Sequence, residues 1–366
     1  MSAMGSRKFS WRRLAVRGRR LHTRYRRQFW TIHSFWALLT GAAVLVLAHN
    51  RYGFVPWVVA FLLLTWGTTL FFSRWSSTSA SNTIAFARGF VSYLTRVMYQ
   101  ETLFFLIPFY SYSTTFPAAN SLFVVVLAGL AVFSCFDIPF DRLLRANRVF
   151  AMTFFGLVTF SALNLLLPIL LEIRVHQATA LAAATAFVAA VPLAYRWSDL
   201  RRGKALVRVG AGVLVALALA TVARPLVPPV PLRLVRLKFS PSINPDTMEV
   251  ERDLPQQVWQ SDLAAGRLFV VATVFAPERL PTSLTIRFRR DGVTLRRSRV
   301  VEVEAHPRGF RIWDALRFPG DGPPPAGRYW AEVWTGERHL VGRGALVILP
   351  DPPAAAGQPL IPPADG

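Results

Sequence analysis

A few polar side chains stand inside long apolar stretches, where a charge or an amide is costly unless it has a partner or a function. Gln100 and Glu101 precede the run Thr-Leu-Phe-Phe-Leu-Ile-Pro-Phe-Tyr, which ends at Tyr110. Asn164 stands in the middle of another apolar run. In a broken helix that lines a cavity, a carboxylate with neighbouring amides could serve proton or solute transfer. We therefore take Gln100, Glu101 and Asn164 as candidate intramembrane polar residues.

Two interpretations of Glu101 are open. In the first, residues 84–98 form an amphipathic helix on the membrane surface, and Glu101 lies where this helix gives way to a span over Thr102–Ala118. Because the helix dipole favours a carboxylate at a helix N-terminus, Glu101 is then an ordinary helix-start residue. The sequence favours this interpretation. In the second, the span begins near Phe90, and Glu101 lies within the bilayer with a partner such as Asn164.

Three tryptophans in the C-terminal third are candidates for ligand binding, since aromatic rings on a β-sheet face can stack on sugars or peptides. They are Trp313, Trp330 and Trp334. Trp330 and Trp334 alternate with Tyr329 and Val333 along one predicted strand, so one of the two sets faces outward. If the tryptophan set does, it lies beside Arg328, Arg338 or Arg343. The competing interpretation places the tryptophans in the core.

The chain carries none of the motifs that mark the common catalytic sites. It has no G-x-S-x-G elbow and no phosphate-binding P-loop. Its histidines lack the spacing of a zinc site. Cys135 is the single cysteine, so neither an internal disulfide nor a cysteine cluster can form. We therefore expect a protein that is not an enzyme, with no cofactor and no bound metal.

The chain divides into a membrane part and a soluble part. Apolar residues make up 53% of the 366 residues, and long apolar runs fill residues 30–226. A spanning helix needs roughly 17–25 mostly apolar residues. About seven runs are candidates: Ile32–His49, Phe54–Phe72, Thr102–Ala118, Ser121–Phe136, Val149–Leu171, Ala178–Ala194 and Val207–Val222. A stiff proline-rich linker over residues 227–231 follows the last run.

Positive charge predicts the orientation of these spans. The formal net charge is +22, and arginine and lysine gather in residues 1–29 and in every second connection. This alternation puts the N-terminus in the cytoplasm and the C-terminal part outside, which in a bacterial inner membrane is the periplasm. Residues 1–29 are predicted to be a basic cytoplasmic arm on anionic lipid headgroups. A nucleic-acid or protein-binding tail is the alternative for this arm, and no specific residue favours it.

The soluble part changes to period-two alternation at Leu232, which indicates β-strands. Residues 232–349 are predicted to form an antiparallel β-sandwich of immunoglobulin-like size. The predicted strands are Leu232–Phe239, Leu268–Phe275, Ser283–Arg289, Val293–Glu304, Phe310–Leu316, Arg328–Trp334 and His339–Leu349. Arg290-Asp291-Gly292 and Thr335-Gly336-Glu337 are hairpin turns. Residues 350–366, rich in proline and alanine, read as a disordered tail.

Several motifs of this part recur together in one known type of domain. They are Ala276-Pro277, the Asp291-Gly292 turn, Gly309-Phe310-Arg311-Ile312-Trp313 and the strand Gly327–Val333. With them, Val274–Leu349 resembles a bacterial periplasmic domain of unknown function that stands at the C-terminus of polytopic membrane proteins. The membrane part, above all the run around Glu101, resembles the uncharacterised multi-span region of such proteins. The resemblance implies a periplasmic β domain and transfers no catalytic residue.

Two functions follow as expectations. The favoured one is a non-enzymatic protein of the bacterial envelope, whose periplasmic β domain binds a glycan, a peptide or a protein partner. Its membrane part would anchor that domain or relay its state. The alternative is a transporter or channel-like protein with a polar site near Glu101.

Overall fold

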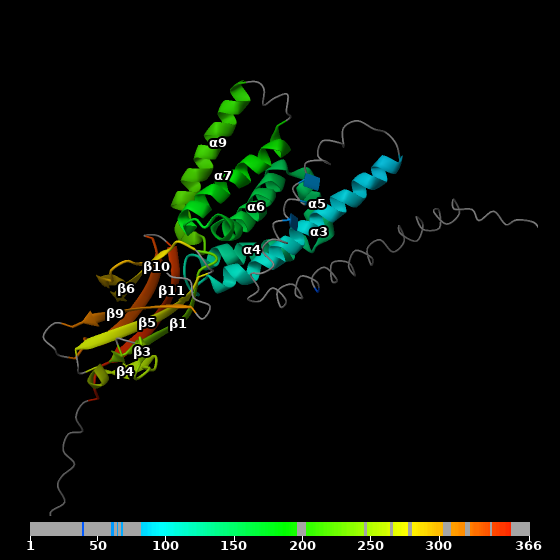
Figure 1. Cartoon of the computed structure of the whole chain (residues 1–366). Coiled ribbons are helices and arrows are strands. Elements are labelled where there is room, and N and C mark those ends of the chain that lie inside the picture. The colour runs from blue at the N-terminus through cyan, green and yellow to red at the C-terminus, as the bar shows by residue number, and fades with distance from the viewer. Residues whose placement is uncertain are drawn as a thin grey trace, which may run out of the picture. The chain divides into compact units, whose positions relative to one another are not determined.

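The computed structural model describes residues 82–195, 203–244, 247–263, 266–276, 280–302, 309–318, 323–336 and 339–352, with six scattered positions between residues 39 and 68. These residues form a helical part followed by a β part (Figure 1). The predicted basic arm, the predicted tail beyond residue 352 and nearly all of the first two predicted spans lie outside the described residues.

The fold has two compact units that do not follow the predicted domain boundary. One comprises residues 1–108 and 126–158, and the other comprises residues 109–125 and 159–366. The second unit therefore unites ends of several helices with the whole β part. The proline-rich segment inside it is packed rather than free, because Val227, Val230 and Leu232 are all buried.

The helical part contains helices of very different length and polarity. They are α3 (Asn82–Tyr112), α4 (Ser121–Ser134), α5 (Asp137–Ala146), α6 (Arg148–Leu171), α7 (Val175–Ala194) and α9 (Gly203–Val222). Three stretches of the described residues are long and apolar enough to span a membrane: Val149–Leu171, Val175–Pro192 and Gly203–Val222. Helix α4 is apolar but has only 14 residues, fewer than a span needs. The total of seven spans stays a prediction.

Helix α3 corrects the favoured interpretation of Glu101. The helix runs without a break from Asn82 to Tyr112, so Glu101 lies in its middle and starts no helix. It also ends at Tyr112 rather than at the predicted Ala118. The reason is local, because no glycine or proline stands between residues 90 and 107, and nothing else there interrupts the backbone hydrogen bonds. Pro108 lies within the last turns, and the helix continues past it.

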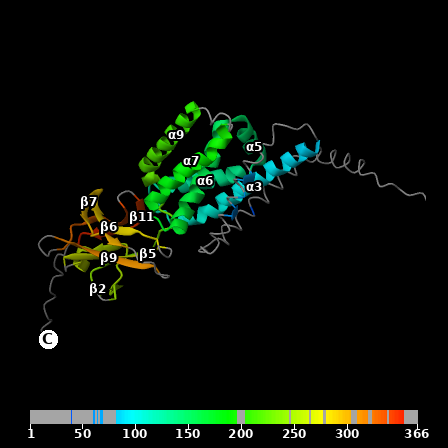
Figure 2. The same cartoon turned by 45° about the horizontal axis from the view of Figure 1, so that its top comes forward.

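Helices α7 and α9 lie side by side (Figure 2). Gly212 of α9 faces the ring of Phe187 in α7, and a Cβ at this position would collide with that ring. The glycine therefore allows the two helices to approach closely, as small residues do in membrane helix pairs.

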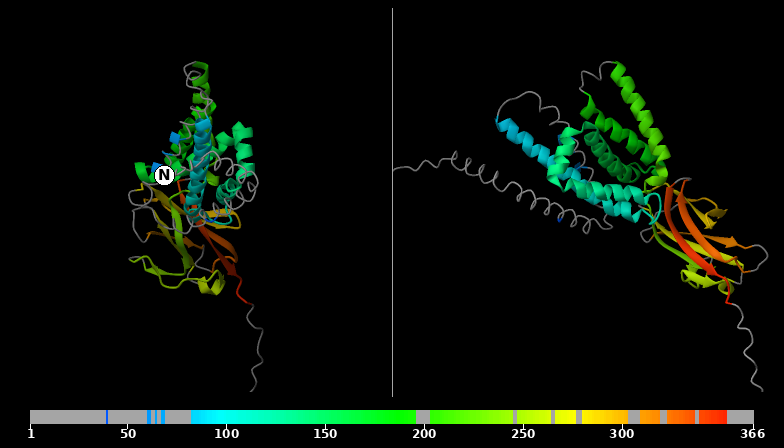
Figure 3. Two further views of the ribbon diagram at one scale, coloured as in Figure 1. Left: turned by 90° about the vertical axis from the view of Figure 1, so that its right-hand side faces the viewer. Right: turned by 180° about the vertical axis from the view of Figure 1, so that it is seen from behind.

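The β part is a sandwich of two main sheets. The three-stranded sheet has the order β1-β5-β9, from β1 (Arg233–Ser240), β5 (Arg267–Phe275) and β9 (Phe310–Arg317). The six-stranded sheet has the order β4-β11-β10-β6-β7, with β8 also paired to β6. Its strands are β4 (Gln257–Trp259), β6 (Ser283–Arg290), β7 (Val293–Arg297), β8 (Val301–Glu302), β10 (Gly327–Thr335) and β11 (His339–Leu349). Figure 3 shows β10 and β11 running side by side.

Three features of the sandwich differ from the prediction. The predicted strand Val293–Glu304 is divided into β7 and β8, with residues 298–300 in neither strand and residues 303 and 304 outside the described residues. The edge strand β4 pairs in parallel with β11, whereas the other described strand pairs are antiparallel. The segment before β5 also holds a small ribbon of β2 (Ile243–Asn244) and β3 (Glu249–Val250), where no strand was predicted. Strands of two or three residues are too short to produce a period-two pattern.

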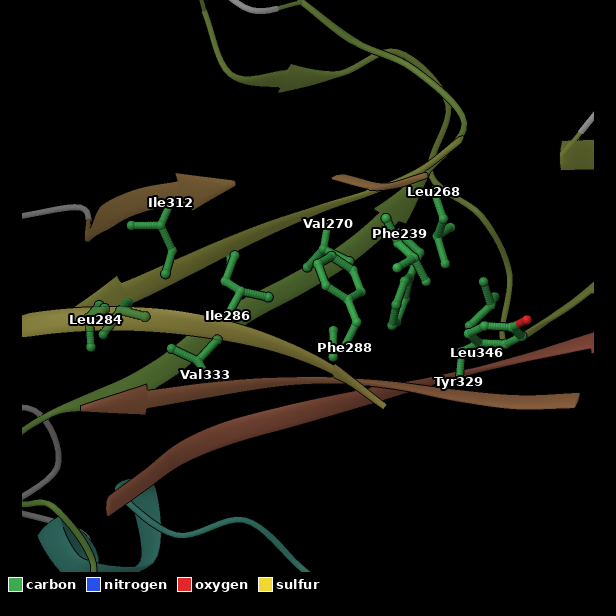
Figure 4. Packing of buried hydrophobic residues seen from close by; sticks show 14 of the residues in the cluster. Phe239, Leu268, Val270, Leu284, Ile286, Phe288, Ile312, Tyr329, Val333 and Leu346 are labelled. Carbon is green, nitrogen blue, oxygen red and sulfur yellow. The ribbon is translucent and has the colours of Figure 1, made fainter. Parts of the chain in front are cut away.

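The core lies between the two main sheets (Figure 4). Alternate residues of β5 point into it and are fully buried, as are alternate residues of β6 and β10, and this confirms the predicted period of two. Phe288, Tyr329 and Val333 from the six-stranded sheet face Phe239, Val270 and Ile312 from the other. The Asp291-Gly292 turn is also confirmed, with both residues at positive φ, 48° and 86°.

Candidate functional site

Asn164 is the centre of a buried chain of polar contacts between helices. Its Nδ2 donates to the hydroxyl oxygen of Tyr110 in α3 at 3.1 Å, and its Oδ1 accepts from Thr179 Oγ1 in α7 at 2.8 Å. The Tyr110 hydroxyl in turn donates to the backbone oxygen of Ser161 at 2.9 Å. All four residues are at most 1% exposed. These contacts therefore tie α3, α6 and α7 together.

The three predicted intramembrane polar residues have different surroundings. Gln100 is buried at 2% exposure and Glu101 is half-buried, both within α3. The contacts of Asn164 go instead to Tyr110 and Thr179, which sequence analysis did not single out. A satisfied amide and hydroxyl chain of this kind mainly holds helices in register. In the sequence, the only indication of these contacts was the presence of polar residues within apolar runs.

Two of the three candidate tryptophans lie on one outer face of the sandwich. In β10, Tyr329 and Val333 are buried in the core, and Trp330 and Trp334 point to the opposite side and are half-buried. Trp313 is on β9 of the other sheet, 36% exposed, with its ring centroid 6.3 Å from that of Phe269. The predicted trio therefore splits between two faces, because its members belong to different sheets.

Arginines surround Trp330 and Trp334 and stack on their rings. The guanidinium carbon of Arg287 lies 4.4 Å from the ring centroid of Trp334. Those of Arg343 and Arg328 lie 4.5 and 5.4 Å from the ring centroid of Trp330. Such cation–π contacts hold a guanidinium in place while its N–H groups stay directed along its own plane. We call this outer surface of the six-stranded sheet the arginine–tryptophan face; it comprises Arg287, Arg289, Arg297, Arg328, Trp330, Glu332, Trp334 and Arg343.

Strand register places four charged residues of this face in one row. Arg297 of β7 is opposite Arg287 of β6, which is opposite Glu332 of β10, which is opposite Arg343 of β11. Directly opposite residues of antiparallel strands share a face. Neighbouring strands lie about 4.8 Å apart, so the row is roughly 14 Å long. We call it the arginine row, and it has three cations and one anion.

Glu332 is the carboxylate of the arginine row, and its charge is already compensated. Glu332 is only 3% exposed. Oε1 lies 3.3 Å from Nη1 of Arg289, and Oε2 accepts from the indole Nε1 of Trp334 at 3.0 Å. A carboxylate held in this way is not a free general base. The face thus presents five arginines against Glu332, whose charge is compensated, while Glu302 lies on the same side opposite Ser283, at the edge strand β8. This excess of positive charge suits anionic groups.

The N-terminal end of β11 meets the helical part within the second compact unit. Asn120, just before α4, donates from Nδ2 to the backbone oxygen of Leu340 at 3.3 Å. Arg343 Nη2 donates to the backbone oxygen of Pro117, in the same α3–α4 loop. His339 is buried beside these contacts. Burial lowers its pKa to about 4, with the positive charge of Arg224 as the next cause.

These observations define a class of protein, with apolar helices long enough to cross a membrane followed by a β-sandwich that carries a basic and aromatic outer face. Within that class, the chain belongs to the family of unknown function DUF5924, whose model matches residues 10–270. The predicted resemblance of the helical region to an uncharacterised family is thereby confirmed. The resemblance of Val274–Leu349 lies beyond the matched residues and stays a prediction.

Solved structures are similar to part of the chain. One of them is an immunoglobulin-like protein from Pseudomonas aeruginosa, 13% identical, covering 32% of this chain and 96% of its own, with a TM-score of 0.23. No curated protein matches this chain.

Proposed function

We propose that this chain is a non-enzymatic protein of the bacterial inner membrane, with its β domain in the periplasm, where the arginine–tryptophan face binds an anionic component of the envelope. The observation that supports this most is the excess of arginines on one sheet face, four of which are held by two tryptophans or one buried glutamate. Arginines fixed in this way lose little side-chain entropy when they bind an anion.

The same contacts favour an anion over a neutral sugar. A sugar ring stacks on the open face of an aromatic side chain. The rings of Trp330 and Trp334 already carry guanidinium groups at 4.4–5.4 Å. A stacked sugar would compete with those cations, whereas a phosphate or carboxylate could accept hydrogen bonds from them.

The size of the face suits a ligand with more than one acidic group. Trp330 and Trp334 are four residues apart along β10, which corresponds to roughly 13 Å. The arginine row is about as long in the perpendicular direction. A single inorganic anion would occupy only part of this area.

The test is a binding titration of the full chain in a neutral detergent. The probes are soluble lipid headgroup phosphates, an anionic glycan and an acidic peptide, each with its neutral counterpart. The face variant is Arg287→Gln/Arg297→Gln. The control variant is Arg236→Gln/Arg317→Gln, which removes two exposed arginines from the outer face of the other sheet.

We expect saturable binding of at least one anionic class. Each arginine near the ligand should contribute about fivefold to the affinity, so the face variant should bind the anionic probe about thirtyfold more weakly. The control variant should leave the affinity unchanged. The basic arm of residues 1–29 is present in all three proteins and adds the same background. Equal binding of neutral and anionic probes, or equal losses in the two variants, would overturn the proposal.

A further inference from the structure

We infer that the anionic ligand of the arginine–tryptophan face is the phosphate of phospholipid headgroups in the leaflet next to the β domain. This inference rests on the proposed function and names its ligand class. It starts from the α3–α4 loop, because that loop touches both the helices and the arginine–tryptophan face.

The α3–α4 loop has the side chains of a membrane–water interface. Tyr112, Phe116 and Leu122 are 41%, 61% and 57% exposed, although each is large and apolar or aromatic. Tyr112 and Leu122 lie at the ends of α3 and α4 next to the loop, and Phe116 lies in the loop itself. Aromatic side chains at the ends of membrane helices typically sit at headgroup depth. The loop therefore marks the level of the headgroups.

The arginine row is fixed to this loop. Arg343 is at one end of the row and donates a hydrogen bond to the backbone oxygen of Pro117. Asn120 of the same loop donates to the oxygen of Leu340, three residues before Arg343 in β11. Both contacts lie within one compact unit. Arg343, the first cation of the row, therefore lies at the level of the headgroups.

The outer face of the three-stranded sheet is also basic, but aromatic and apolar side chains separate its cations. Phe269, Val271 and Phe275 of β5 occupy the middle of that face. Arg267 of β5 is directly opposite Arg317 of β9, and the guanidinium carbon of Arg233 in β1 lies 5.7 Å from the ring centroid of Tyr112. The six-stranded sheet differs in that a cation of its row, Arg343, donates a hydrogen bond to the backbone of the α3–α4 loop. This contact is the observation that favours lipid phosphates at the arginine–tryptophan face.

The experiment compares lipid retention by the full chain. The protein is placed in nanodiscs of phosphatidylcholine with or without phosphatidylglycerol, released in the gas phase, and the bound lipids are counted by native mass spectrometry. Parallel samples contain glycerol phosphate or inorganic phosphate in place of phosphatidylglycerol. The proteins are the unchanged chain, the face variant and the control variant. Arg297→Gln is added as a single change at an exposed position that cannot unfold the domain by losing a buried contact.

We expect the unchanged chain to retain phosphatidylglycerol in preference to phosphatidylcholine. Retention should fall about fivefold in Arg297→Gln and about thirtyfold in the face variant, and the control variant should match the unchanged chain. Soluble phosphates should bind at least tenfold more weakly than the lipid.

Two other outcomes would overturn the inference and separate it from the proposed function. If the face variant retains as much phosphatidylglycerol as the unchanged chain but loses binding of a soluble anionic glycan or acidic peptide, the lipid is the wrong ligand and the proposed function stands. If the face variant changes the binding of no anion, both fail.

Discussion

Glu332→Gln is the change that most directly tests the electrostatic argument, because stability and ligand binding should respond in opposite directions. Glu332 is buried among arginines and pairs with Arg289 at 3.3 Å. Glutamine keeps the size of the side chain and can still accept a hydrogen bond from Trp334, but it removes the negative charge of the arginine row. The cations of the arginine row then repel one another without compensation.

The expected loss of stability is modest. Removing one partner of a fully buried ion pair costs about 3–5 kcal/mol, but the Arg289 side chain is 36% exposed and water screens its charge. We therefore expect a loss of about 1–2 kcal/mol. For a domain of this size that corresponds to a fall in melting temperature of about 5 °C.

The expected gain in binding comes from the same lost charge. A carboxylate about 7 Å from a bound anion repels it by about 0.6–1 kcal/mol in a largely aqueous setting. Its removal should tighten anion binding about three- to fivefold. The assay pairs thermal unfolding of the full chain with titration of an anionic lipid, and Glu249→Gln, an exposed change on β3, is the control. A variant that loses both stability and binding would refute the reasoning, since the glutamate itself would then hold the ligand.

Three further changes test other parts of the fold. Because burial lowers the folded-state pKa of His339 to about 4 from an ordinary 6.5, the stability tied to the neutral ring is complete above pH 6.5. It should be lost as the pH falls towards 4, by at most about 3 kcal/mol. Unfolding at several pH values checks this, and His339→Gln should flatten the profile. Tyr110→Phe leaves Nδ2 of Asn164 without its hydroxyl acceptor and should cost about 1 kcal/mol in detergent-induced unfolding; no change would mean that the buried polar chain does not hold the helices. Phe288→Ala removes a core side chain that is 1% exposed and should destabilise the β part by about 3–5 kcal/mol. A melting curve followed by near-ultraviolet circular dichroism would show this loss. An unchanged curve would contradict the placement of Phe288 in the core.

Helix α3 shows where local sequence patterns stop being informative. The change from amphipathic to apolar sequence near Glu101 resembles the end of a surface helix, and both interpretations agree with the residues. Helical hydrogen bonds join backbone groups, and α3 continues as one helix from Asn82 to Tyr112, past both Gly89 and Pro108. A change in side-chain polarity alters what surrounds the helix without ending it. Local sequence patterns also could not predict the partners of Asn164, because they are 54 and 15 residues away in the chain.

What the sequence determined by itself is the part of the fold that rests on near neighbours. Apolar runs of sufficient length predicted the three helices that could span a membrane, among about seven predicted spans. Alternation predicted seven strand regions, one of which is divided in the structure, and the residue types of Asp291-Gly292 predicted the turn. The period of two also predicted that Trp330 and Trp334 face away from Tyr329 and Val333, whereas the structure decided that the tryptophans are the outward set.

Only the tertiary structure decided which of these residues meet. Arg297, Arg287, Glu332 and Arg343 come from four strands, and no local pattern encodes the register that aligns them. The same pairing separates Trp313 from the other two tryptophans by placing β9 in the opposite sheet. Strand pairing is set by the burial of a shared core between distant segments. For that reason the arginine row and its contact with the α3–α4 loop exist only in the folded chain.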